Sequence, residues 1–576
     1  MYILGISCDY HDSSAALLLD GQLVAAASEE RFSRRKHDSA IPSLTIAWCL
    51  EHAGIQARDL DYVVFYEKPL LKFDRIITTS VDYYPRALPF FREALLTWFS
   101  EKLWIKSRLL KSLGVPSERM LFCEHHMAHA ASAFYCSGFP EAAILTVDGI
   151  GEWATATIGE GRGGEIRLPL EIRWPHSLGM LYSVFTAFLG FEVNEGEYKV
   201  MGMAPYGTPR YMDKVWKLVR TSEDGAIELN LDYFSYHLSP RRAFSDKFLA
   251  LFGEPRSPHG LDDALDQGRH YADIAASLQK VTEEILLRMA RAAASRSGSK
   301  RLVMAGGVAL NCVANGRIQD EAGIEELFVQ PAAGDGGASL GAALWAWHAV
   351  LGKPRGAQLP HVSWGRAVPG REIQSELELT GAHGVSLKSE EELLDRATED
   401  LLAGKVIGWS QGRFEWGPRA LGNRSILADP RHGETRDLVN TKIKFRETFR
   451  PFAPSLTEEC AARYFEQPLE HQPTAKFMLR TATVCSGMRY RIPAVTHVDG
   501  SARPHLVERA ANPLYFDLIR RFGDASGDPV LLNTSFNLRG EPIVASAADA
   551  LSTFFRSGLD VLYLENYRVA KEGAGL

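Results

Sequence analysis

The sequence lacks several features that would assign it to a special class of protein. Its 576 residues contain 7 cysteines, and no two of these form a CxxC pair. Scattered thiols of this kind fit a reducing compartment better than a disulfide framework. The longest apolar helical stretch, residues 340–351, contains His348 and is too short to span a bilayer. The first residues enter a strand pattern without a basic, signal-like segment, so we expect a cytoplasmic location.

A strong net charge of either sign is also missing. The net charge is −7, and basic residues cluster only locally, around 31–36 and 410–450. This balance argues against a general nucleic-acid or membrane-surface binder, and we expect neither kind of partner. Hydrophobic residues make up 46% and charged residues 23% of the chain, as in ordinary globular proteins. Because 576 residues exceed what one hydrophobic core serves, we expect two large domains.

The sequence does contain two similar hairpin patterns. Apolar runs predict strands at residues 2–7, 14–19 and 22–27 in the first pattern and at 143–147 and 154–158 in the second. Asp20-Gly21 joins two runs of the first pattern and is a strong hairpin signal. A strand, a polar Asp/Gly turn and a returning strand, repeated within one domain, are typical of the actin-like ATPase superfold. In that fold the two turns face each other and bind phosphates through backbone N–H groups.

Histidine spacing marks a candidate metal site between these hairpins. His125 and His129 lie four residues apart in a stretch that the following small residues predict to be a short helix. Residues at this spacing share one helix face, whereas His126 lies about 100° away and is not expected to bind metal. Asp148 follows one predicted strand and Asp335 follows another, at 327–330. Two imidazoles with carboxylates suit Fe, Zn or Mn, although an isolated HxxxH more often only caps a helix.

Other segments complete the predicted organisation of the first domain. Residues 70–115 are rich in aromatic and basic side chains and predict helical insertions. Residues 267–294 have the periodicity of a long amphipathic helix that serves the core. Residues 301–311 form a strand pattern that runs into a glycine turn, where a nucleotide-like ligand could approach the backbone closely. The Pro- and Gly-containing stretch 352–364 predicts a linker, followed by an α+β domain of roughly 210 residues.

Three segments of the second domain combine cations with glycine and proline. They span residues 411–425, 440–455 and 532–542. Arginine offers planar bidentate donors to phosphate, and lysine offers a mobile point charge. Such rows suit a nucleotide or acyl-phosphate pocket. Taken singly, each segment could equally be a solvated basic face that nearby Asp and Glu residues neutralise.

With these residues laid out, the chain resembles the O-carbamoyltransferases of the NodU/CmcH/TobZ family along almost its whole length. The matching motifs are Tyr10-His11-Asp12-Ser13-Ser14-Ala15-Ala16, Glu29-Glu30-Arg31-Phe32-Ser33-Arg34, the histidine segment from His125 to Ala133, Lys199-Val200-Met201-Gly202-Met203-Ala204-Pro205-Tyr206-Gly207, Gly306-Gly307-Val308-Ala309-Leu310-Asn311, Gly417-Pro418-Arg419-Ala420-Leu421-Gly422, Arg450-Pro451-Phe452-Ala453-Pro454-Ser455 and Asn533-Thr534-Ser535-Phe536-Asn537. So many long matches in a fixed order are highly specific.

The resemblance implies an α/β enzyme of two domains. Residues 1–352 would form an actin-like, TsaD-like domain, 353–364 a linker, and 365–576 an α+β YrdC-like domain. In the second domain, carbamoyl phosphate and ATP, with Mg²⁺, would yield carbamoyl-adenylate and pyrophosphate. The carbamoyl group would then pass to a hydroxyl of a small natural-product acceptor at the first domain's metal site. That metal is expected to be iron, and the resemblance allows a homodimer.

The resemblance also implies roles for individual residues. Metal ligands would be His125, His129, Asp148 and Asp335. His11 would be the general base, and Asp9 would contact substrate or orient the base. Nucleotide, carbamoyl phosphate or the intermediate would contact Lys199, Gly202, Gly207, Gly306, Gly307 and Asn311 in the first domain, and Arg419, Arg424, Lys444, Arg450, Arg503 and Ser535 in the second.

Some alternatives remain open. His11 could instead be a structural partner of its own turn. An actin-superfold kinase or a tRNA threonylcarbamoyl-type transferase would share the first domain, but it would leave the basic second domain without a role. A non-catalytic nucleotide-binding protein would have little need for HxxxH with two aspartates. No matching motif identifies the acceptor, and residues 70–115 are our candidate for its surface.

Overall fold

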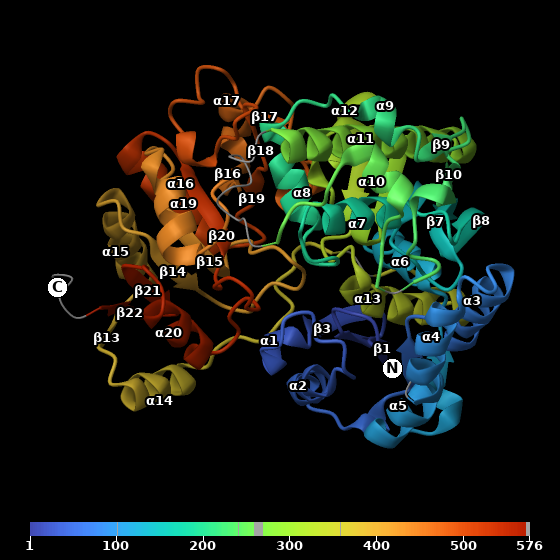
Figure 1. The fold of residues 1–576 in the computed structure, drawn as a ribbon. Helices are drawn as coiled ribbons and strands as arrows, with labels where there is room; N and C mark the ends of the chain where they lie inside the picture. Colours follow the sequence, from blue (N-terminus) through green and yellow to red (C-terminus); the bar gives the residue numbers. More distant parts are fainter. Residues whose placement is uncertain (101, 240, 259–268, 357–358, 572–576) are drawn as a thin grey trace. The chain divides into compact units, whose positions relative to one another are not determined.

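The computed structural model describes residues 1–100, 102–239, 241–258, 269–356 and 359–571 (Figure 1). The chain divides into two compact units. The first unit comprises Met1–Glu29 and His37–Leu359, and the second comprises Glu30–Lys36 and Pro360–Leu576. The second boundary falls inside the expected linker, 353–364. The segment Glu30–Lys36, which we expected in the first domain, groups with the second unit instead.

The first unit begins with a five-stranded sheet in the order β3-β2-β1-β4-β5, within the described residues. Its strands are β1 (Tyr2–Ser7), β2 (Ser14–Leu19), β3 (Gln22–Ser28), β4 (Tyr62–Phe65) and β5 (Met120–Phe122). β1, β2 and β3 pair antiparallel, whereas β4 and β5 run parallel to β1. Asp20 and Gly21 both have positive φ, 49° and 80°, which is the conformation a tight hairpin turn requires. The predicted first hairpin is therefore confirmed.

A second sheet in the described part of this unit repeats the same order, as β8-β7-β6-β11-β12. Its strands are β6 (Glu141–Val147), β7 (Ala154–Arg162), β8 (Glu165–Arg173), β11 (Arg301–Ala305) and β12 (Glu326–Val329). β6, β7 and β8 again pair antiparallel, and β11 and β12 again run parallel to the first strand. β7 extends beyond the predicted 154–158 because Gly159 and Gly161 both pair with β6, although the register with β8 shifts between Ile158 and Glu160. The duplicated topology agrees with the actin-like arrangement expected for the first domain.

Helices α6 (His125–Phe134) and α13 (Asp335–Trp345) pack closely against each other, α13 lying against the first sheet and α6 against the second. Glycine makes this possible. A Cβ on Gly341 of α13 would lie 1.8 Å from the carbonyl oxygen of Ala128 in α6. A Cβ on Gly5 of β1 would lie 1.8 Å from the carbonyl oxygen of Ser339 in α13. Two backbone-to-backbone approaches therefore hold α13 in place, and its first residue is Asp335.

The remaining helices of the first unit follow the sequence patterns. The insertion 70–115 forms α3 (Pro69–Asp82), α4 (Leu88–Ser100) and α5 (Ile105–Leu113). The predicted long helix is α11 (His270–Ser297), and the first two residues of its expected range, 267–268, lie outside the described residues. Smaller elements are α2 (Ser43–Ala53), α7 (Leu178–Phe188), α8 (Glu197–Met203), α9 (Met212–Val215), β9 (Val219–Thr221), β10 (Ile227–Leu229), α10 (Asp246–Phe252) and α12 (Cys312–Glu321). No helix in the described ranges is both long and apolar enough to cross a membrane.

The second unit is built on an eight-stranded mixed sheet, counted over the described residues, in the order β13-β22-β21-β14-β15-β20-β16-β19. The strands are β13 (Gly384–Ser386), β14 (Ile407–Ser410), β15 (Arg424–Ala428), β16 (Ala453–Thr457), β19 (His505–Val507), β20 (Val530–Ser535), β21 (Val561–Leu564) and β22 (Tyr567–Ala570). Successive residues face opposite cores, since Ile426 packs with Phe554 on one face and Leu427 packs with Leu518 on the other. This mixed topology agrees with the expected α+β class.

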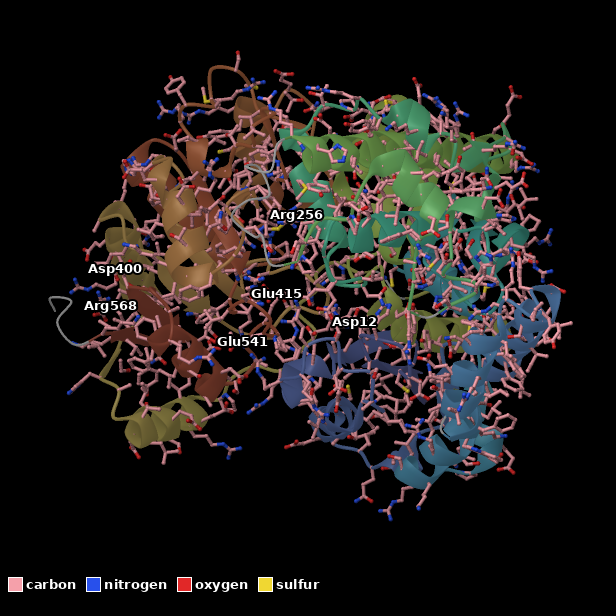
Figure 2. The ribbon with its side chains drawn as sticks, viewed as in Figure 1. Asp12, Arg256, Asp400, Glu415, Glu541 and Arg568 are labelled. Carbon is pink, nitrogen blue, oxygen red and sulfur yellow. The ribbon has the colours of Figure 1, made fainter. Side chains whose placement is uncertain are left out.

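Helices cover both faces of this sheet. α15 (Glu390–Leu402) and α19 (Pro513–Ser526) pack on one face, and α20 (Ala547–Phe555) packs on the other. α14 (Gly370–Thr380), α16 (Glu434–Leu438), α17 (Ala461–Tyr464), α18 (Pro473–Lys476), the short pair β17 (Ala482–Thr483) and β18 (Ser501–Ala502), and α1 (Glu30–Ser33) from the N-terminal segment complete the unit. Asp400 on α15 accepts hydrogen bonds from Arg568 on β22 at 2.9 and 3.0 Å and so ties helix to sheet (Figure 2).

Candidate metal centre and anion site

The predicted HxxxH lies on α6, as its spacing requires. Helix α6 begins at His125, and the small residues that follow let neighbouring elements approach closely. Both imidazoles are buried, and their Nε2 atoms lie 3.1 Å apart. The two side chains therefore direct the same ring nitrogen to one point, which a helix face with a four-residue spacing allows.

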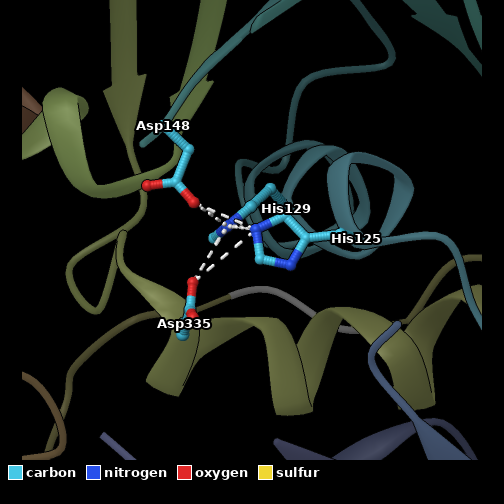
Figure 3. A group of neighbouring side chains, drawn as sticks. All are labelled: His125, His129, Asp148 and Asp335. Carbon is cyan, nitrogen blue, oxygen red and sulfur yellow. Dashed lines mark hydrogen bonds and ion pairs between the residues drawn. The ribbon is translucent and has the colours of Figure 1, made fainter. Parts of the chain in front are cut away.

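Two carboxylates from different elements meet these imidazoles (Figure 3). Asp148 follows β6, and its Oδ2 lies 3.0 Å from His125 Nε2 and 3.5 Å from His129 Nε2. Asp335 opens α13, and its Oδ1 lies 3.7 and 3.6 Å from the same two nitrogens. The backbone N–H of Gly307 donates to Asp148 Oδ1 at 2.8 Å and fixes that carboxylate.

The donor set fits a divalent transition metal. One ligand atom from each of the four residues lies within 4.8 Å of all the others. Although burial opposes a charged imidazole, Asp148 and Asp335 raise the pKa of His129 to about 9. Although burial opposes ionisation, His125 and His129 in turn hold the pKa of Asp148 well below its usual value. This concentration of buried charge, and the Oδ2 of Asp335 left without a hydrogen-bond partner in the described structure, are what a bound cation would satisfy.

His126 lies outside this group. Its Nδ1 lies 2.6 Å from the hydroxyl of Thr146, and burial together with the two neighbouring histidines lowers its pKa to about 3. The side chain is therefore a neutral, hydrogen-bonded histidine. This agrees with the helical spacing, which places His126 on a different face of α6 from His125 and His129.

Glu152 supports the centre and was not singled out from the sequence. Its carboxylate accepts from the backbone N–H of His125 at 3.0 Å and from that of Lys68, before α3, at 2.8 Å. A carboxylate at a helix N-terminus is favourable because the first N–H groups lack intrahelical partners. Glu152 thus ties the loop that carries Asp148 to the start of α6. Its position four residues after Asp148 was the one available signal.

His11 lies beside the metal candidates, 4.0 Å from Asp335 Oδ2 through its Nε2. Its Nδ1 donates to Asp12 at 2.9 Å, which leaves Nε2 facing the centre. Although burial opposes the charged form, Asp335 and Asp12 raise the pKa of His11 to about 9. The two carboxylate oxygens of Asp9 instead accept hydrogen bonds from Arg108 Nη1, at 2.9 and 3.1 Å. The orienting carboxylate in this geometry is therefore Asp12, which the sequence did not indicate.

The other candidates of the first domain have varied surroundings. Gly306 has φ of 96°, and a Cβ there would lie 2.2 Å from the carbonyl oxygen of Val147. Gly306 and Gly307 thus form the turn against Asp148. Gly207 packs against the backbone of α11 at Ala272. Three further candidates lie on α8 or at the start of α12: Gly202 is buried in α8, Lys199 Nζ lies 5.8 Å from the ring centroid of Phe191, and Asn311 caps α12 by accepting from Ala314 N at 3.1 Å.

In the second unit, Lys444 and Ser535 come together. Lys444 is buried, and its ammonium donates to the Ser535 carbonyl at 2.7 Å and to Asn537 Oδ1 at 2.6 Å. The Ser535 hydroxyl also donates to Asn537 Oδ1, at 2.7 Å. Burial lowers the pKa of Lys444 well below its usual value, and the nearby cations Arg446 and Arg450 lower it further. Positive charge is therefore concentrated here, as an anion site requires.

The remaining arginines differ in what they offer. Arg450 lies 3.6 Å from Glu447, and the Nε atom of Arg503 is buried without a hydrogen bond among the described residues. Arg424 is fully buried, and its Nη atoms donate to backbone carbonyls of Gln411, Gly412 and Asn423 at 2.9 to 3.0 Å. Through these bonds Arg424 holds the 411–412 turn, and its place among the anion ligands stays a prediction.

Both halves of the chain match known protein families. Residues 2–344 match the family described as carbamoyltransferase N-terminus, and residues 398–571 match the one described as carbamoyltransferase C-terminus. The chain belongs to the carbamoyltransferase family. This carbamoyltransferase is 44% identical to "Uncharacterized protein sll1178" of Synechocystis over 99% of its own length and 97% of the relative.

Two further relatives carry functional names. Nodulation protein NolNO of Sinorhizobium fredii is 37% identical over 98% of the carbamoyltransferase and 79% of the relative. The 3'-hydroxymethylcephem-O-carbamoyltransferase of Amycolatopsis lactamdurans is 37% identical over 43% of the chain and 44% of the relative. The chain is therefore an enzyme of this family, and the resemblance that the motifs indicated is confirmed.

Proposed function

We propose that this carbamoyltransferase is an ATP-dependent O-carbamoyltransferase that modifies a hydroxyl of a small natural product. The observation that carries the proposal is the convergence of His125, His129, Asp148 and Asp335 beside His11. A separate cationic site around Lys444 in the second unit supports a division of labour between activation and transfer. A relative named as a cephem O-carbamoyltransferase supports a hydroxyl acceptor.

Activation belongs to the second domain in this proposal, on a YrdC-like fold. Atom balance requires water to cleave carbamoyl phosphate into carbamate and phosphate. A carbamate oxygen then attacks the α-phosphorus of ATP, forming carbamoyl-adenylate and releasing pyrophosphate. Lys444, Arg450, Arg419 and Arg503 would neutralise phosphate charge, with Ser535 as a hydroxyl contact and Mg²⁺ on the nucleotide. Adenylation gives the poorly electrophilic carbamoyl group a good leaving group.

Transfer belongs to the first domain. In its neutral form, His11 would accept the proton of the acceptor hydroxyl at Nε2, because Asp12 occupies Nδ1. Asp335, which helps to raise the pKa of His11 to about 9, is itself a candidate metal ligand, so a bound cation would favour that neutral form. The hydroxyl oxygen forms the new bond to the carbamoyl carbon, and AMP leaves. Gly306 and Gly307 provide a backbone turn against which the intermediate's phosphate could lie. A metal held by the two histidines and two aspartates, which we expect to be iron, would supply Lewis-acid stabilisation of developing negative charge.

The test of the proposal separates its two steps. Metal-loaded enzyme is given ATP with and without carbamoyl phosphate, and pyrophosphate is measured. We expect release only when carbamoyl phosphate is present. A panel of hydroxylated natural products, including a 3'-hydroxymethylcephem, is then searched by mass spectrometry for the gain of one carbamoyl group. ATP hydrolysis without carbamoyl phosphate, or phosphate transfer to an acceptor, would contradict the proposal and favour a kinase.

Variants within one short segment show whether the second unit activates carbamoyl phosphate. Lys444→Met removes a buried ammonium and should lower pyrophosphate release by roughly 10- to 100-fold, the loss of a charge-assisted contact. Lys442→Met removes an exposed ammonium two residues away and should leave release unchanged. Equal activity of the two variants would move the activation site away from Lys444.

A further inference from the structure

The loop that carries His11 depends on residues at both ends of the segment that enters the second unit. We call residues 8–13 the His11 loop and Glu30–Lys36 the strap. Within the first unit, Asp9 N donates to the Ser39 carbonyl and Ser13 N donates to the Asp38 carbonyl, both at 2.8 Å. Glu29 N donates to the Ser13 carbonyl at 2.8 Å. Residues immediately before and after the strap therefore fix both ends of the His11 loop.

Hydrogen bonds between side chains also hold the His11 loop. His37, the first residue after the strap, donates from Nδ1 to Asp12 Oδ1 at 2.7 Å. The other oxygen of Asp12 accepts from His11 Nδ1 at 2.9 Å. Asp12 is thus shared between the candidate base and the end of the strap, and the orientation of His11 depends on where His37 lies.

The backbone in these two segments is held in conformations that non-glycine residues rarely adopt. Asp9 and Asp12 have φ of 71° and 52°, and Arg34 and His37 have φ of 59° and 54°. Such residues cost of order 1–3 kcal/mol each and persist only where surrounding contacts determine them. The His11 loop and the strap end therefore need external support to keep their shape.

The strap finds firm support inside the second unit. Arg34 donates to the carbonyls of Pro542 and Ile543 at 2.9 and 2.7 Å and pairs with Asp549 at 3.1 Å. Arg31 is buried and donates to the Gly417 carbonyl at 2.8 Å. A plain linker would be solvated, whereas this segment buries an arginine that donates to a backbone carbonyl.

We propose that docking of the strap in the second unit positions His11, through His37, Asp12 and the backbone clamps at Asp9 and Ser13. His37 and Asp12 are positioning residues in this arrangement, and His11 is the group they serve. The assignment of a catalytic task to His11 rests on the proposed function, but the dependence of the loop on the strap does not.

Hydrogen exchange of the full-length protein tests this dependence without any substrate. Arg34→Ala removes the arginine that binds Pro542, Ile543 and Asp549, and we expect peptides covering residues 8–14 to exchange about tenfold faster. Arg35→Ala changes an exposed neighbour on the same strap and serves as the matched control. If the strap peptide exchanges faster in Arg34→Ala while residues 8–14 keep the wild-type rate, the proposal is wrong.

Two variants at His37 separate the side chain from the backbone. Glycine and asparagine both tolerate the positive φ of this residue, but only asparagine keeps an amide donor near the position of Nδ1. We expect His37→Gly to expose residues 8–14 to exchange and to lower carbamoyl transfer to the panel acceptor about tenfold. His37→Asn should restore both, and pyrophosphate release should stay unchanged in each variant. Equal behaviour of the two variants would exclude the side-chain relay.

The outcomes also distinguish this proposal from the proposed function. Loss of exchange protection in His37→Gly, with no carbamoyl product from any protein, would keep the strap proposal and reject the assigned reaction. Carbamoyl transfer at the wild-type rate in His37→Gly, despite faster exchange, would reject the role of the strap in catalysis.

Discussion

At the scale of single residues, the candidate metal centre brings two carboxylates and two imidazoles together in a buried place. Asp148 and Asp335 are both drawn to the His125–His129 pair, and burial would penalise two ionised carboxylates there unless cations compensate. His129, whose pKa is raised to about 9, supplies a positive charge in the metal-free protein. A divalent ion would replace its proton, since a ligand imidazole must be neutral.

His129→Ala tests the ligand set directly. The variant removes one of four donors, so we expect metal content to fall and carbamoyl transfer to drop by on the order of 1,000-fold or more. Carbamoyl-phosphate-dependent pyrophosphate release should persist, because Lys444 and its neighbours lie in the other unit. Metal analysis of the purified variant and the two activity assays give the readout.

His126→Asn is the matched control for that variant. Asparagine keeps a side-chain polar group that can reach the Thr146 hydroxyl, and His126 lies outside the ligand group. The control should therefore retain metal and transfer. Survival of both activities in His129→Ala would contradict the metal assignment.

At the scale of elements, the geometry of the centre rests on close helix packing. Gly341 lets α13 approach the Ala128 carbonyl of α6, which lies between the two candidate ligand histidines in the sequence. Gly5 lets β1 approach the other side of α13 at Ser339. The distance from Asp335 to the histidines is therefore set by backbone contacts, which tolerate no extra atom.

Gly341→Ala should disturb both stability and the metal site. A new Cβ would lie 1.8 Å from a carbonyl oxygen, so the helices must separate, at a cost of roughly 3 kcal/mol or more. We expect weaker metal binding and a lower urea midpoint. Gly370→Ala, at a position with open space around it on α14, should leave both unchanged. A stable Gly341→Ala protein with full metal affinity would show that α13 does not hold Asp335 rigidly.

Local pattern was enough to predict most elements, because turn chemistry and periodicity act over a few residues. The Asp20-Gly21 hairpin, the HxxxH helix and the strand before Asp148 all formed where expected. The swap of Glu30–Lys36 into the second unit could not be predicted, since its contacts to Gly417 and Ile543 lie nearly 400 and over 500 residues away. No local signal encodes contacts of that range.

The candidate site shows the same contrast between features that are local in sequence and contacts that are long-range. The four metal candidates were found because HxxxH spacing and strand-end aspartates are local features. The side chains that support them were missed. Asp12, Glu152 and His37 act through hydrogen bonds that only the folded chain brings together. Arg424 shows the reverse case, since a cation in a Gly-rich segment proved to be bonded to its own loop.

At the scale of the whole molecule, the chain passes between its units at three points, at residues 29–30, 36–37 and 359–360. Each unit has its own sheets and its own candidate ligand. A ligand that binds only the native form of one unit stabilises that unit by mass action. The two ligand classes should therefore act on different parts of the unfolding profile.

Metal removal tests this separation by calorimetry. At a free metal concentration about 1,000 times Kd, binding stabilises the native first unit by about 4 kcal/mol, so chelation should lower one unfolding transition by roughly 5–10 °C. The midpoint temperature of the other transition should not change with the chelator, and it should rise when carbamoyl phosphate and a non-hydrolysable ATP analogue are added. His129→Ala identifies the first unit, because only its metal-sensitive transition should lose the response. A metal response that persists in His129→Ala, or one shared equally by both transitions, would place the ion somewhere other than the His125–His129 centre.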